Sequence, residues 1–256
     1  MRVACVGDSL TRLYPALLDR LVSGADVRGF DVDCTSVLSS PGCSTNRCGC
    51  LSYRATQAWA DALAWAPDTI VAQFGTSDSA RPWYDGWGSE FEDGFENFIA
   101  TVQSRNVSVV LVRPPPLFSG KENRNATITN ALYGHSFERI QRKTGALLVD
   151  GHAKLLGHRD KFDDDGVHPT CAGAAKLAKS VRGVLVENFD GLGKRNAEHL
   201  CPFTFAEKCE EGHYECVLAG LAAAVFILLA GAGLLAIRRR RRAISPVKTT
   251  SNVAPV

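Results

Sequence analysis

The chain has 256 residues, of which 22% are charged and 45% hydrophobic, and its formal net charge is +2. Six of its 29 basic residues lie beyond residue 237, so the first 237 residues carry 23 basic and 27 acidic side chains, a formal charge of −4. The length predicts one main domain with a small appendage, and the charge of that main part gives no support to a nucleic-acid partner.

The chain opens with an apolar run that breaks at Gly7-Asp8-Ser9. Leucines at positions 10, 13, 17, 18 and 21 follow with the spacing of a helix that covers a sheet. We therefore expect Ser9 at the carboxyl end of a strand and beside a helix N-terminus, which is where ligands bind in open α/β sheets. Two roles are open for Ser9: a nucleophile, or a residue that only caps the helix.

Strand-like and helix-like patterns then alternate along the chain. We expect further strands within 31–38, 69–74, 107–112 and 146–149, and helices at about 52–66, 91–102, 129–144 and 174–185. Strands that are apolar on both faces imply a mostly parallel sheet covered by helices on two sides. The prediction is a three-layer α/β/α, flavodoxin-like domain over residues 1–188, with a five-stranded sheet.

The last 40 residues differ in composition from this domain. Residues 217–237 carry no charge and are followed by five arginines, and 21 residues at 1.5 Å each suffice to cross a hydrocarbon core of ~30 Å. We expect a single transmembrane helix at 217–237, a cysteine-containing stalk at 189–216 and a basic, disordered tail at 238–256. The arginines predict a cytoplasmic tail, which places the domain on the extracellular or luminal side.

Nine cysteines agree with an oxidising compartment. Two groups predict disulfides, whose pairing the sequence does not give: Cys34, Cys43, Cys48 and Cys50 in one loop, and Cys201, Cys209 and Cys216 before the span. The first group lacks the paired spacing of zinc sites, so we expect no metal. Sequons at Asn106 and Asn125 predict a glycoprotein.

The first 18 residues contain no apolar segment adequate for a signal peptide, and cleavage after them would remove Ser9. Two explanations are open. The natural start lies upstream of Met1, or the final helix inserts as a tail anchor and leaves the domain in the cytosol. The arginines and the cysteines favour the upstream start.

Motifs at the ends of the predicted strands and before the last helix point to an activity. Gly7-Asp8-Ser9-Leu10 follows the first strand, Gly75-Thr76-Ser77-Asp78 follows another, and Asp165-Gly166-Val167-His168-Pro169 precedes the final helix. In this order the motifs resemble those of the GDSL, or SGNH, hydrolase family, and the resemblance covers about residues 2–188. It implies a serine esterase that uses no cofactor.

The resemblance implies a role for each of three residues: Ser9 as nucleophile, His168 as general base, and Asp165 as the carboxylate that orients the imidazole. The chemistry needs these groups because a hydroxyl attacks an ester only when a base accepts its proton, and histidine side chains titrate near neutral pH. The alternative interpretation is a capping serine, a loop histidine and solvated aspartates.

An oxyanion hole is implied as well, and here the sequence departs from the family. The family uses the backbone N–H of the serine, the backbone N–H of a glycine and an asparagine side chain. Ser9 and Gly42 supply the first two, with Gly42 preferred to Gly49 because Pro41-Gly42 opens the loop soon after the second strand. Ser77 stands where the family has asparagine, and we expect it as the third donor, although its hydroxyl donates one hydrogen bond and reaches less far than an amide. Without a contribution from Ser77, the loss of one donor would cost about 10²–10³-fold in turnover.

We therefore expect a membrane-anchored esterase that removes O-acyl groups, such as acetyl, from a small-molecule or glycan ester through an acyl-enzyme. The alternative is a catalytically weakened SGNH-fold binding module, for which Ser77 is the argument. A nucleotide-binding flavodoxin-like domain is disfavoured because the chain has no glycine-rich phosphate loop.

Overall fold

The computed structural model describes residues 1–38, 48–80, 89–118, 124–196 and 200–201. Its central sheet contains β1 (Arg2–Gly7), β3 (Asp26–Asp31), β6 (Thr69–Gln73), β7 (Ser108–Arg113) and β8 (Leu147–Asp150). The strand order is β3-β1-β6-β7-β8, and every neighbouring pair is parallel. The sequence-based prediction of a parallel, five-stranded, flavodoxin-like sheet is confirmed, with its topological switch point between β1 and β6.

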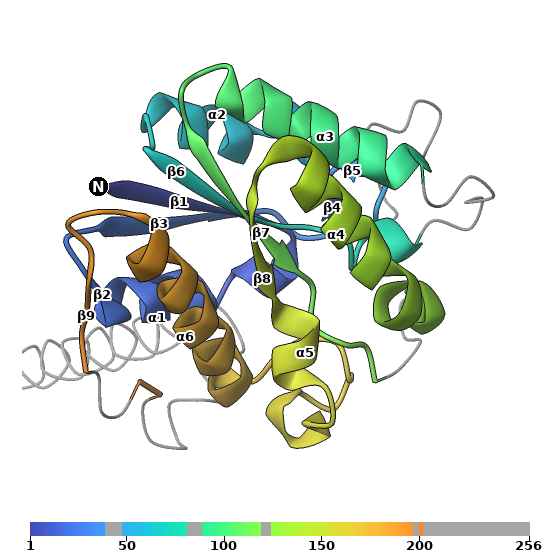
Figure 1. Cartoon of the computed structure of the whole chain (residues 1–256). Coiled ribbons are helices and arrows are strands. Elements are labelled where there is room, and N and C mark those ends of the chain that lie inside the picture. The colour runs from blue at the N-terminus through green and yellow to red at the C-terminus, as the bar shows by residue number, and fades with distance from the viewer. Residues whose placement is uncertain (39–47, 81–88, 119–123, 197–199, 202–256) are drawn as a thin grey trace, which may run out of the picture. The chain divides into compact units, whose positions relative to one another are not determined.

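Helices cover both faces of the sheet (Figure 1). One face packs against α2 (Gln57–Ala64), α3 (Ser89–Gln103) and α4 (Tyr133–Thr144). The other packs against α1 (Tyr14–Leu21), α5 (Gly151–Leu155) and α6 (Cys171–Asn188). The three expected layers are therefore present.

Strand β6 shows why the buried strands can be predicted from the sequence. All five of its residues are buried. Ile70 and Ala72 pack into the core on the α3 face, whereas Val71 packs into the core on the α6 face. Because both faces are covered, the strand is a continuous apolar run instead of an alternating pattern.

Two local predictions near the start of the chain are wrong. The second strand of the sheet is β3, at Asp26–Asp31, and not within 31–38, where only the short β4 (Thr35–Ser36) forms and pairs with β5 (Leu51–Ser52). As an edge strand β3 leaves most of its side chains accessible, so it lacks an apolar run. The α-helix after Ser9 begins at Tyr14, and Ser9–Thr11 is a single 3₁₀ turn.

The chain divides into two units, Met1–Cys201 and Pro202–Val256. The first unit thus extends beyond residue 188, where we expected the domain to end. Two short strands contribute to this extension, because β9 (Gly193–Lys194) pairs with β2 (Val22–Ser23). Leu200 is buried, and Cys201 forms a disulfide with Cys171, the first residue of α6.

The disulfides that the structure describes follow the two predicted cysteine groups only in part. Cys34 bonds to Cys48 within the predicted loop group, but Cys201 bonds to a residue of the domain. Cys50 is disulfide-bonded too, and Cys5 is buried and reduced. The remaining predicted cysteines, Cys43, Cys209 and Cys216, lie outside the described residues.

The predicted span at 217–237 and the tail at 238–256 also fall outside the described ranges. Within those ranges, no helix combines the length and hydropathy needed to cross a bilayer.

Candidate active site

Two loops meet at the carboxyl edge of the sheet, one after β1 and one after β6. Their strands are neighbours, with Gly7 opposite Gln73. A side chain at Gly7 would place its Cβ 2.2 Å from the carbonyl oxygen of Gln73, so the first glycine of the motif permits this close approach. The arrangement brings the loop of Ser9 beside the loop of Ser77.

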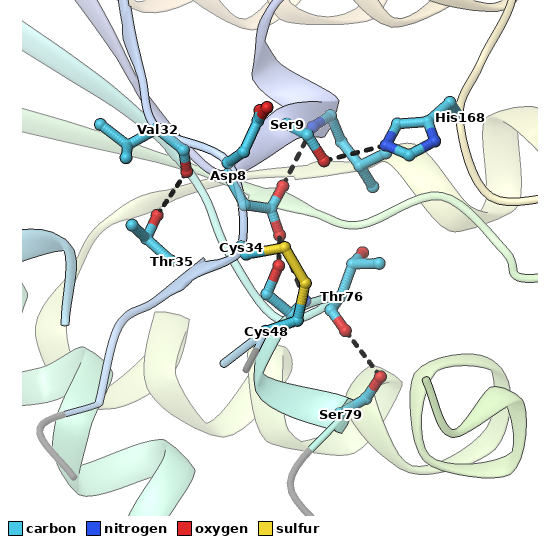
Figure 2. Close-up of a disulfide and its surroundings, with 12 residues drawn as sticks. Asp8, Ser9, Val32, Cys34, Thr35, Cys48, Thr76, Ser79 and His168 are labelled. Atoms are coloured by element: carbon cyan, nitrogen blue, oxygen red, sulfur yellow. Dashed lines mark hydrogen bonds between the residues drawn. A yellow bond between two sulfur atoms is a disulfide. The ribbon is translucent and has the colours of Figure 1, made fainter. Parts of the chain in front are cut away.

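Ser9, His168 and Asp165 lie in hydrogen-bond contact although 156 or more residues separate the serine from the other two. The Ser9 hydroxyl oxygen is 3.0 Å from Nε2 of His168, and Nδ1 of His168 is 2.5 Å from Oδ2 of Asp165. In Figure 2 the Ser9 hydroxyl points toward the His168 ring. The three side chains form a hydroxyl–imidazole–carboxylate chain, the arrangement that activates a serine in hydrolases.

The loop before α6 fixes the carboxylate of this chain. The second oxygen of Asp165 accepts hydrogen bonds from the backbone N–H groups of Val167 and His168, at 2.8 and 3.0 Å. Burial opposes ionisation of Asp165, but the hydrogen bonds from the His168 side chain and from these two N–H groups outweigh it and lower its pKa. Asp165 is therefore held as a carboxylate facing the imidazole.

Asp8 caps the turn that carries Ser9. One oxygen of its carboxylate accepts the N–H of Leu10 at 3.1 Å, so the capping residue is Asp8 and not Ser9. The side chain is buried, with 1% exposed. Burial raises the pKa of Asp8, while hydrogen bonds from Leu10 and Ser77 and the charge of Arg124 act in the opposite direction.

Ser77 is also buried, and it directs its polar hydrogens at Asp8. Both its backbone N–H and its hydroxyl donate to Oδ2 of Asp8, at 3.2 and 3.1 Å. We expected this hydroxyl to contribute to the oxyanion hole. Because a hydroxyl has one hydrogen to donate, the Ser77 side chain as placed here has none left for an oxyanion.

A comparison with families of known proteins identifies the family of this chain. The model of the GDSL-like Lipase/Acylhydrolase family matches residues 5–176, which include all three members of the Ser9–His168–Asp165 chain. The chain belongs to the GDSL-like lipase/acylhydrolase family. The description of that family names lipases and acylhydrolases, which are enzymes that cleave acyl esters.

Relatives of this GDSL-family chain include esterases. An acetylxylan esterase from Xylanibacter ruminicola is 29% identical over 215 residues, which are 72% of this chain and 43% of that protein. The chain thus spans less than half the length of this curated relative. Among solved structures, acetyl xylan esterase AlAXEase has a TM-score of 0.55 at 17% identity, with 72% of this chain and 98% of that chain covered. The acetylxylan esterase Axe2 from Geobacillus stearothermophilus has a TM-score of 0.51 at 18% identity, with coverages of 74% and 94%. At these identities the solved structures support the fold.

One residue that the sequence predicts for the GDSL-family site cannot be placed. Gly42, the predicted second oxyanion donor, lies outside the described residues. Among the residues that are described, no group of three or more histidine, cysteine, aspartate or glutamate side chains is arranged to hold a metal ion.

The structure adds one charged residue that the sequence motifs did not indicate. Arg124 is 4% exposed, and it interacts electrostatically with Asp8 and with Asp165. It follows no strand and belongs to no recognisable motif, so its neighbourhood becomes visible only in the folded chain. The only signal in the sequence was its position directly before the Asn125 sequon and the helical pattern at 129–144.

Proposed function

We propose that this chain is a serine esterase that removes O-acyl groups through an acyl-enzyme. The observation that carries the proposal is the continuous contact from the Ser9 hydroxyl through His168 to the Asp165 carboxylate, at 3.0 and 2.5 Å. Each member then has a role that its neighbours suit: Ser9 is the nucleophile, His168 the general base and Asp165 the orienting carboxylate.

The reaction divides into two halves. Nε2 of His168 accepts the hydroxyl proton as the oxygen of Ser9 bonds to the ester carbonyl carbon, and a tetrahedral intermediate with a negative oxygen forms. The imidazolium returns the proton to the leaving alcohol as the ester C–O bond breaks, which leaves the acyl group on Ser9. Water, deprotonated by His168, then attacks the acyl carbon. The bond to Ser9 breaks as the imidazolium returns its proton to the Ser9 oxygen, and the acid is released. Asp165 fixes the imidazole so that Nε2 faces Ser9 throughout.

Backbone N–H groups can donate hydrogen bonds to the negative oxygen of the intermediate. The family resemblance assigns this task to the N–H of Ser9 and to the N–H of Gly42, and we carry both assignments over. The third assignment, to the side chain at position 77, has less support, because the Ser77 hydroxyl donates to Asp8.

The substrate that we propose is an O-acetyl or other short acyl ester on a small molecule or a glycan. The acetylxylan esterase from Xylanibacter ruminicola supports this class, since it matches 72% of this chain. No cofactor takes part in the proposed reaction.

We also propose the setting that the sequence suggests. The span at 217–237 anchors the enzyme by a single helix, with the catalytic domain on the extracellular or luminal side and the arginine-rich tail in the cytoplasm. The disulfides Cys34–Cys48 and Cys171–Cys201 support an oxidising compartment. The side chains at both sequons, Asn106 and Asn125, are exposed, as glycosylation requires.

A second candidate function is favoured by one observation. Because the Ser77 hydroxyl is bonded to Asp8, position 77 does not offer the side-chain donor that the family places at the oxyanion. A catalytically weakened module that binds an acyl or glycan ligand in the same site is the alternative to an active esterase.

Turnover of p-nitrophenyl acetate and of acetylated xylo-oligosaccharides by the purified full-length chain distinguishes the two functions. The esterase proposal predicts saturable release of p-nitrophenol and acetate by the wild type and none above background by Ser9→Ala. Binding of the oligosaccharide to both proteins without turnover by either would support the binding module instead.

A further inference from the structure

The oxyanion of the proposed reaction would form close to two buried or partly buried carboxyl groups. Two carboxylates, Asp8 and Asp165, already flank Ser9 and His168, and Asp8 is almost completely buried. Attack on an ester adds a negative charge on the substrate oxygen, while an imidazolium forms on His168. Charges of the same sign repel strongly at a site of low dielectric, so this site calls for a positive charge nearby.

The backbone after Arg124 is joined to all three loops of the site. The N–H of Asn125 donates to the hydroxyl of Ser79 at 3.2 Å, and Ser79 lies two residues after Ser77. Ala126 packs against a small buried cluster that contains Leu10, the residue after Ser9, and Val167, the residue before His168. These contacts place residue 124 at the junction of the three loops.

Charge and burial fit this position. The guanidinium interacts electrostatically with Asp8, Asp165 and Asp33. Two of these adjoin the reacting groups, since Asp8 precedes Ser9 and Asp165 contacts His168. Arg124 is 4% exposed, which keeps water from screening its charge. Burial lowers the pKa of Arg124, while the charges of Asp8, Asp165 and Asp33 act in the opposite direction. The guanidinium keeps its positive charge because the ordinary pKa of arginine lies far above neutral.

We infer that Arg124 stabilises the oxyanion in this esterase and takes over the task of the missing asparagine. The inference rests on the proposed function, since it concerns the transition state of that reaction. Arg124 adds a positive charge close to Asp8, Asp165 and Asp33, so the oxyanion forms near a cation. The substitution of asparagine by Ser77 is then compensated within the same chain, and Ser77 serves to hold Asp8.

The test compares four full-length proteins: wild type, Arg124→Met, Arg124→Lys and Arg12→Met. Arg12 is the control for loss of a positive charge near the same loops, because it is half-exposed and its ion pairs are with Asp31 and Asp33, of which only Asp33 also interacts with Arg124. For each protein we would measure kcat and KM with p-nitrophenyl acetate, with the concentration of active enzyme determined by fluorophosphonate labelling. We would also measure the inhibition constant of phenylboronic acid, which forms a negatively charged tetrahedral adduct with a serine.

The inference predicts that Arg124→Met lowers kcat about 10²–10³-fold, the loss expected for one oxyanion donor, while KM changes less than about threefold. Binding of the boronic acid weakens by a similar factor, Arg124→Lys recovers part of both losses, and Arg12→Met resembles the wild type. Arg124→Gln replaces Arg124→Met in the comparison if the methionine variant does not fold.

Two kinds of result would overturn the inference, and they are distinguishable. An active, Ser9-dependent wild type whose kcat and boronic acid affinity survive the loss of the Arg124 charge contradicts this inference alone. A loss confined to KM, or a loss that disappears when rates are divided by the labelled fraction, contradicts it in the same way. A wild type without Ser9-dependent turnover contradicts the proposed function and this inference together.

Discussion

The hydroxyl of Ser77 donates its hydrogen to the buried carboxylate of Asp8, 3.1 Å away. Asp8 in turn caps the turn that carries Ser9. A residue at the family's oxyanion position therefore acts here as a support for the nucleophile loop. This relationship makes stability and turnover respond differently to changes at position 77.

Replacing Ser77 by alanine removes a hydrogen bond to a buried charged group. We expect the free energy of unfolding to fall by about 1.5–3 kcal/mol, the usual contribution of such a bond. The kcat of the variant should stay within about threefold of the wild type, because the hydroxyl is not aimed at the oxyanion. Urea denaturation and turnover of p-nitrophenyl acetate measure the two effects.

Ser136→Ala is the matched control for this change. Ser136 is also buried, and its hydroxyl donates to the carboxylate of Glu92 between α3 and α4. It should lose a comparable free energy of unfolding with unchanged kcat. If kcat fell 10²-fold or more in Ser77→Ala but not in Ser136→Ala, the result would contradict this prediction and would indicate that the Ser77 hydroxyl contributes to the oxyanion hole.

Replacing Asp165 by asparagine tests the orienting carboxylate. The amide cannot stabilise the imidazolium and favours the wrong tautomer of His168, so kcat should fall by about 10⁴-fold, as in other hydroxyl–imidazole–carboxylate sites. Asp164→Asn is the control, because this neighbour is exposed and should retain wild-type turnover. Equal losses in both variants would count against the assignment of Asp165.

The same substitution should change how stability depends on pH. The pKa of Asp165 is lower in the folded chain than its ordinary value of 3.8. Its contribution to the free energy of unfolding is therefore present above that value and is lost as pH falls through the folded-state pKa. The stability difference between wild type and Asp165→Asn, measured by urea denaturation, should shrink as the pH is lowered from neutral to below 3.8. A difference that is constant with pH would contradict the lowered pKa.

Replacing Cys201 by serine should destabilise the first unit of the chain. The disulfide to Cys171 closes a loop with a sequence separation of 30 residues, and removing such a constraint costs about 3 kcal/mol. The bond holds the start of α6, three residues after His168. Chemical denaturation of the oxidised wild type and of the variant measures the loss. Stability unaffected by the substitution, or peptide mapping that shows Cys171 unpaired in the wild type, would contradict the pairing.

Gly7 should not tolerate a side chain. A Cβ at this position would lie 2.2 Å from both the carbonyl oxygen of Gln73 and the hydroxyl of Thr11. Gly7→Ala should therefore lower the free energy of unfolding by about 1–3 kcal/mol and lower kcat by displacing the loop of Ser9. Gly183→Ala in α6 is the control, since a Cβ there meets nothing within 4 Å and alanine favours the helix. Similar stabilities for the two variants would contradict the close approach of β1 and β6.

The architecture was largely predictable because the inner strands are covered on both faces. Runs such as that of β6 are apolar throughout, and the helices between them carry apolar residues on one side. The edge strand β3 was not predicted because most of its side chains are accessible to solvent. Its exposed Arg28 and Gly29 give neither an apolar run nor an alternation, and its position is fixed by pairing with β1.

Only the site residues that belong to a short sequence motif could be predicted. Ser9, Asp165 and His168 stand in short motifs, and the structure brings the three together. The direction of the Ser77 hydroxyl and the position of Arg124 depend on contacts between loops that are far apart in the sequence. Such contacts leave no local pattern of hydrophobicity or spacing, so only the folded chain reveals them.

Covalent labelling of Ser9 is the most direct test of the central claim. The full-length protein would be treated with a fluorophosphonate, digested and examined by mass spectrometry, with Ser9→Ala and His168→Ala treated in parallel. An activated Ser9 predicts one phosphonylated peptide that contains Ser9 in the wild type, none in Ser9→Ala and much slower labelling in His168→Ala. Absence of the adduct on Ser9 in folded wild-type protein, or labelling that is unchanged in His168→Ala, would contradict the account.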